Sequence, residues 1–75
     1  MNRDTAEKVV ELMLRHGREL DDSVRVVQSA QSEVEFDRHR TAVGRIMGEM
    51  LLEIMNPLFD EHPDLKPPSF ASSYS

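Results

Sequence analysis

The chain has 75 residues, no cysteine, no tryptophan and a formal net charge of −5. A chain this short forms one domain at most and buries little surface by itself. Proteins of this size usually need a disulfide, a bound metal or oligomerisation for stability. Without cysteine, neither a disulfide nor a thiolate zinc site can provide it. The negative charge disfavours nucleic acid and anionic membranes as partners. No stretch approaches the ~20 apolar residues that span a bilayer. We therefore expect a cytoplasmic protein.

Apolar residues recur at helical spacing from about residue 4 to residue 29, which predicts a first long helix capped by Asp4 or Thr5. Gly17 could end a helix at His16, as C-terminal glycines often do. The apolar stripe keeps its phase across Gly17, and we therefore predict one continuous helix. The stripe consists of Ala6, Val9, Val10, Met13, Gly17, Leu20, Val24 and Val27.

Residues 29–32 form a short polar connection, and Ser32 with Glu35 makes the S-x-x-E capping box that announces a new helix. A second long helix is predicted over about 33–55. Because a short connection places consecutive helices antiparallel, the two helices should form a hairpin. The inward stripe of the second helix is Phe36, His39, Arg40, Val43, Ile46, Met47, Met50 and Ile54.

Asn56 and Pro57 predict the end of the second helix and the start of a short helical turn over about 57–61. An extended strap follows, in which Leu65 and Phe70 are candidates to dock on the helices. The expected organisation is an all-α hairpin domain over residues 1–65 and an extended, partly disordered tail over 66–75.

The end of the second helix is apolar on most sides. Residues 46–55 read Ile-Met-Gly-Glu-Met-Leu-Leu-Glu-Ile-Met, and their two acids, Glu49 and Glu53, share one narrow face. A single neighbouring helix covers only part of such a surface, and soluble monomers avoid leaving large apolar patches in water. The pattern therefore predicts a homodimer that completes a four-helix bundle.

Gly44 and Gly48 form a G-x-x-x-G pair, in which small residues one turn apart make a flat strip. If the hairpin turns near residue 31, position i faces roughly position 62 − i, so Gly17 should lie opposite Gly44 and the helices should approach closely there. The alternative is that these glycines only avoid crowding. The candidate residues for close packing or dimer contact are Gly44, Met47, Gly48, Leu51 and Met55.

His39 and Arg40 interrupt the apolar stripe, and the same facing rule places Arg40 near Asp22. We favour an ion pair that fixes the hairpin register. The alternative is a ligand site built from Asp22, His39 and Arg40. The basic residues around Arg40 are neutralised by neighbouring acids, which argues against binding of DNA or RNA.

The sequence contains no constellation typical of catalysis. The three histidines, His16, His39 and His62, are far apart, and no Glu-x-x-His motif, nucleophile elbow or glycine-rich phosphate loop occurs. We predict no metal, no cofactor and no enzymatic activity. The expected function is that of a small homo-oligomeric interaction module, such as an adaptor, regulator or subunit. The expected partner is a second copy of the chain, and another protein is a further possible partner. A small-ligand binder or minor enzyme at Arg40 is the alternative.

Overall fold

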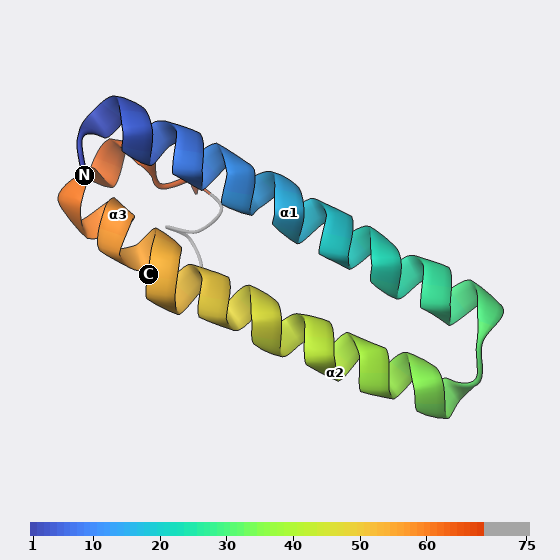
Figure 1. Ribbon diagram of the computed structural model, residues 1–75. Helices are drawn as coiled ribbons and strands as arrows, with labels where there is room; N and C mark the ends of the chain where they lie inside the picture. Colours follow the sequence, from blue (N-terminus) through green and yellow to red (C-terminus); the bar gives the residue numbers. More distant parts are fainter. Residues whose placement is uncertain (69–75) are drawn as a thin grey trace.

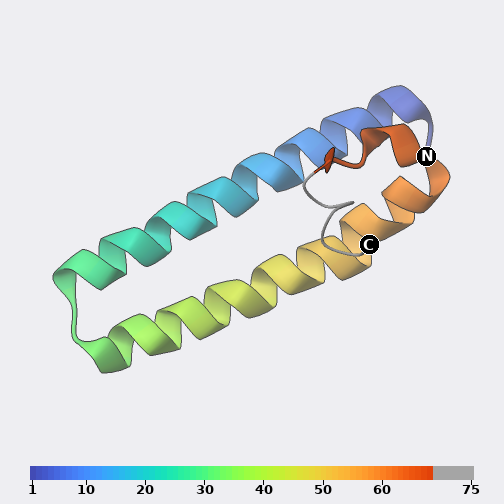
Figure 2. The same cartoon turned by 180° about the vertical axis from the view of Figure 1, so that it is seen from behind.

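The computed structural model describes residues 1–68, which form a helical hairpin (Figure 1). α1 spans Arg3–Ala30 and α2 spans Glu33–Glu49, and the two helices run antiparallel side by side. Both views from front and back show the same two long arms (Figure 2). The predicted all-α hairpin of two long helices is confirmed.

The N-cap of α1 lies two residues before Asp4, the first of the predicted cap candidates. The side chain of Asn2 accepts a hydrogen bond from the backbone N–H of Thr5 at 2.8 Å, so Asn2 is the N-cap, whereas Asp4 and Thr5 lie inside the first turn. The helix passes through Gly17 without a break, as predicted. Every residue of the predicted stripe is buried or half-buried, which confirms the inward face of α1.

The connection between the arms consists of Gln31 and Ser32. The hydroxyl of Ser32 accepts a hydrogen bond from the backbone N–H of Glu35 at 3.3 Å, which is the predicted start of the second helix. The N–H of Gln31 bonds back to the carbonyl of Val27 and closes the last turn of α1.

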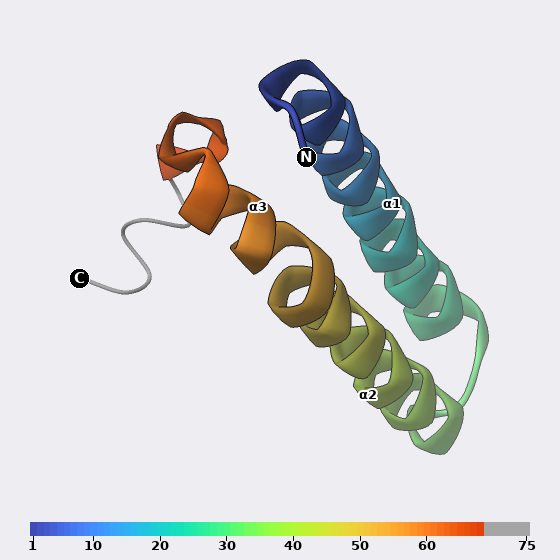
Figure 3. The same ribbon diagram turned by 60° about the vertical axis from the view of Figure 1, so that its left-hand side comes forward.

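The second arm does not end at Asn56 and Pro57, contrary to the expectation. α2 continues into a π-helical segment, η1, at Met50–Met55, and η1 leads directly into α3 at Asn56–Glu61 (Figure 3). The N–H of Asn56 bonds to the carbonyl of Leu51, five residues back. In a regular α-helix the ring of Pro57 would clash with the carbonyl four residues earlier. The wider π turn just before Pro57 lets the chain stay helical.

The core lies at one end of the hairpin, where η1 and α3 meet the first half of α1. Its buried members are Ala6, Val10, Met55, Leu58 and Phe59. A 3-10 turn, η2, at Pro63–Leu65 follows α3, and Leu65 packs against this core, as the sequence suggested. The predicted docking of Phe70 and most of the predicted tail fall on residues 69–75, outside the described residues.

Candidate functional site

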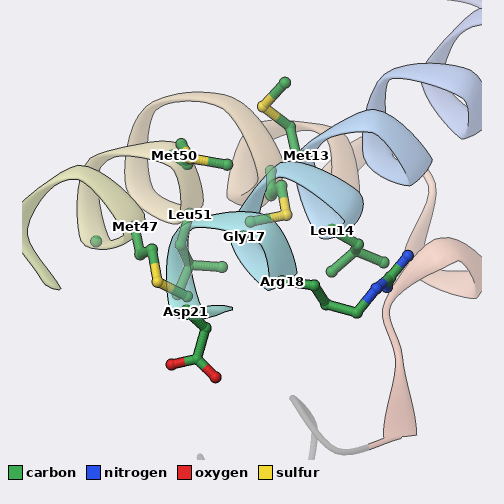
Figure 4. A pocket seen from close by; sticks show the side chains of 10 residues that line it. Met13, Leu14, Gly17, Arg18, Asp21, Met47, Met50 and Leu51 are labelled. Carbon is green, nitrogen blue, oxygen red and sulfur yellow. The ribbon is translucent and has the colours of Figure 1, made fainter. Parts of the chain in front are cut away.

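An apolar groove runs between the two arms next to the core. It has a volume of about 510 Å³. Met13, Leu14 and Gly17 of α1 form one wall, and residues of α2 and η1 form the other (Figure 4). The second wall consists of Met47, Gly48, Met50, Leu51 and Met55. We refer to these lining residues together as the groove.

The groove contains four of the five residues predicted for close packing or dimer contact, namely Met47, Gly48, Leu51 and Met55. Met55 also belongs to the core of its own chain, with 5% of its surface exposed. The π turn explains this placement, because the extra residue in the turn moves Met55 inward in place of Ile54, which is exposed.

The arms do not approach closely at Gly44. Among residues 1–68, a Cβ atom at Gly44 or at Gly48 would meet no atom of another element within 4 Å, whereas a Cβ atom at Gly17 would lie 3.6 Å from Cε of Met47. The expected contact between Gly17 and Gly44 is therefore wrong, and a methionine side chain fills the space opposite Gly17. Gly44 is exposed outside the groove, whereas Gly48 is half-buried in the wall of the groove.

Two charged residues of opposite sign, Arg18 and Asp21, lie at the edge of the groove, and their side chains extend outward (Figure 4). Asp21 forms an ion pair with Arg25 at 3.0 Å. Arg18 forms no ion pair with any residue in the described part of the chain. The edge of the groove thus carries both a cation and an anion.

The residues of the second candidate site are not brought together. Asp22 pairs with Arg25 at 2.6 Å, and Arg40 pairs with Asp37 at 3.3 Å. The guanidinium of Arg40 also lies over the ring of Phe36, 5.6 Å from its centre. The expected ion pair between Asp22 and Arg40 is therefore wrong, because Arg40 points outward and is satisfied within its own helix.

His39 makes the polar contact between the arms that Arg40 was expected to make. Its Nε2 atom lies 2.9 Å from the hydroxyl of Ser23, and that hydroxyl donates its one hydrogen to the carbonyl of Leu20 at 2.6 Å. Nε2 of His39 is consequently the donor, and Ser23 is the acceptor. The rule that position i faces 62 − i identifies this pair, although the charge of the neighbouring Arg40 made an ion pair with Asp22 the expected contact.

Two ion pairs at the core end, Arg3 with Asp64 and Met1 with Glu61, were not predicted from the sequence. We call them the charged clasp. Nε of Arg3 donates to Asp64 at 2.9 Å, and the amino group of Met1 donates to Glu61 at 3.0 Å. The hydrogen bond from Arg3, supported by its charge, lowers the pKa of Asp64. The hydrogen bond from the Met1 amino group, again with its charge, lowers the pKa of Glu61. Nε2 of His62 donates to the carbonyl of Met1 at 2.9 Å and ties α3 to the start of α1.

Residues 1–68 hold no group of three or more histidine or acidic side chains placed to bind a metal ion. None of the helices in this range is both long enough and apolar enough to span a bilayer. The lining of the groove offers packing surface with few polar groups. Comparison with protein family models, with curated proteins and with solved structures finds no match to this chain.

Proposed function

We propose that the protein is a non-enzymatic interaction module that pairs with a second copy of itself through the groove, forming a four-helix bundle. The observation that carries this proposal is the apolar groove itself, which lies open beside a small core. Three further features support it, namely the small size of the core, the open space at Gly44 and Gly48, and the charges at the groove edge.

The core of one hairpin is small. Among the described residues, no large side chain is fully buried, and several apolar side chains of the second arm remain in water. Leu52 is 65% exposed, and the groove residues Met47, Met50 and Leu51 are only half-buried. Burial of a Leu or Ile side chain contributes about 1.5–3 kcal/mol, which is a large share of the stability of so small a domain. A second hairpin is the simplest source of the missing contacts.

Gly44 and Gly48 have no evident role inside one hairpin. A glycine in the interior of a helix costs about 1 kcal/mol relative to alanine. Neither glycine has a positive φ, and neither has a neighbour within 4 Å of the position of a Cβ atom. A close approach of another helix to this side of α2 would use the space that the missing side chains leave.

The charges at the groove edge suit a copy of the same chain. In a two-fold interface each surface meets itself, so a self-complementary edge needs both signs of charge. Arg18 and Asp21 provide them. The whole chain carries a net charge of −5, so two copies repel unless the contacting face is locally balanced.

The test is the solution mass over a dilution series, measured by light scattering or sedimentation equilibrium. We expect twice the mass of one chain at high concentration. Gly48→Leu should raise the dissociation constant of the dimer about 10- to 100-fold, because overpacking an interface costs ~1–3 kcal/mol. Within one hairpin the new side chain meets open space and a better helix former replaces glycine, so the helix content of the variant should not fall.

Ala42→Leu is the matched control. Ala42 is exposed and lies on the same helix, but six residues from Gly48 and therefore on a different side. This variant should retain the dissociation constant of the wild type. A wild-type chain that is monomeric and rigidly folded at all concentrations would refute the proposal. A dimer that Gly48→Leu leaves intact would refute the assignment of the groove.

A further inference from the structure

We propose that the outer side of the second arm is a separate docking surface for a basic amphipathic helix of another protein. The surface consists of Ile46, Glu49, Met50, Glu53 and Ile54, and we call it the acidic face. It is distinct from the self-association surface, although Met50 borders both, and it rests on different observations.

The acidic face has a shape suited to binding a helix. Its five residues line a shallow hollow of about 250 Å³. Ile46, Met50 and Ile54 recur every four residues, so the row is about 12 Å long at the helical rise of ~1.5 Å per residue. Ile46 is 49% exposed and Ile54 is 39% exposed. A helix that binds in a groove presents apolar anchors at a matching spacing of about one turn.

The charges of the acidic face identify the kind of partner. Glu49 and Glu53 are exposed, lie one turn apart along the apolar row, and form no ion pair with any residue in positions 1–68. Arg45 precedes Glu49 by one turn and does not pair with it. A helix with lysine or arginine beside its apolar stripe would place its cations on these two carboxylates.

A second copy of the chain does not fit this surface. Two-fold pairing of the acidic face would bring both carboxylates of each copy together, and like charges across an interface disfavour the complex. The same charges disfavour an anionic membrane surface. The groove edge, which carries both signs, and the acidic face, which carries one, therefore suit different partners.

The experiment uses the full chain and a defined probe, an 18-residue helical peptide with leucine on one face and lysine on the other. Binding is measured by fluorescence anisotropy at physiological ionic strength. We expect saturable binding that weakens about tenfold in the Glu49→Gln, Glu53→Gln double variant, since two exposed ion pairs are lost. Substitution of Ile46 and Ile54 by Ser should also weaken binding, and a peptide with glutamate in place of lysine should not bind.

The matched control is Glu11→Gln with Glu19→Gln, which removes the same two charges from exposed positions of α1. It should bind the lysine peptide as the wild type does. An equal loss of peptide affinity in this control would mean that binding depends only on net charge, and it would overturn the proposal. The absence of peptide binding to the wild type would overturn it as well. If the substitutions at Ile46 and Ile54 lower self-association instead, the occupant is a second copy. The Gly48→Leu variant should bind the peptide like the wild type, so this result does not depend on the dimer.

Discussion

The two ends of the hairpin differ in what holds them together. At the core end, η1 and α3 pack against the first half of α1, Leu65 of η2 joins this cluster, and Val10, Leu58 and Phe59 are nearly inaccessible. At the turn end, α1 and α2 are the only described elements that meet. Phe36, Val24 and Val27 are half-buried there, and Val26 and Val34 are largely in water.

This difference shows what a third segment contributes to a two-helix fold. Two helices in contact can shelter only the residues along one seam, whereas a segment packed across them shelters whole side chains. The turn end compensates with local and polar interactions, such as the Ser32 cap and the contact between Ser23 and His39. Substitutions at the two ends should therefore have effects of different size.

The largest expected effect is the loss of Phe59. Phe59→Ala should lower the free energy of unfolding by about 3–5 kcal/mol, because it removes a buried ring and leaves a cavity. The same substitution at the turn end, Phe36→Ala, should cost only about 1 kcal/mol, because that ring is half-buried. Urea denaturation followed by circular dichroism measures both values. Equal losses would mean that the two ends do not differ in packing.

A smaller effect should identify the polar contact that joins the arms at the turn end. Ser23→Ala removes the acceptor for His39 and should cost about 1 kcal/mol. Ser29→Ala is the control, since the Ser29 hydroxyl also bonds back to its own helix, at the carbonyl of Val26, but makes no contact with the other arm. The difference between their urea midpoints isolates the contact between arms. If the two variants match, the contact with His39 contributes nothing.

The smallest effect should come from the charged clasp at the core end. The pKa values of Glu61 and Asp64 are lowered from 4.5 and 3.8 in the folded chain. Their contribution to stability is therefore complete above these ordinary values and is lost as the pH falls through the lower folded values. The thermal midpoint should decline modestly below about pH 4.5, and Asp64→Asn or Arg3→Gln should reduce that decline. An unchanged decline in both variants would exclude the pair of Arg3 and Asp64 as its source.

Much of the fold could be predicted from local signals. The stripe of α1, its continuity through Gly17 and the start of the second helix at Ser32 are each encoded by spacing or by a cap. The facing rule also identifies the pair of Ser23 and His39. These features depend on residues a few positions apart or on a single turn, so periodicity and capping chemistry are sufficient.

The placement of the candidate site could be predicted only in part. The sequence indicated that the second arm has too much apolar surface for one neighbour, and the structure leaves Ile46, Leu52 and Ile54 exposed. It did not indicate the π turn, which moved Met55 into the core. It also misplaced Arg40, which lies about 100° around α2 from the half-buried His39 and is exposed.

The sequence by itself determined two amphipathic helices, the turn between them and the excess of apolar surface on the second. Only the tertiary structure decided which side of that surface the core uses, since this choice follows from the π turn before Pro57 and from the return of the chain to α1. Helical periodicity is a property of neighbours in sequence. The π turn and the contact between Arg3 and Asp64 depend instead on where segments distant in sequence meet. A local sequence pattern contains no information about such contacts.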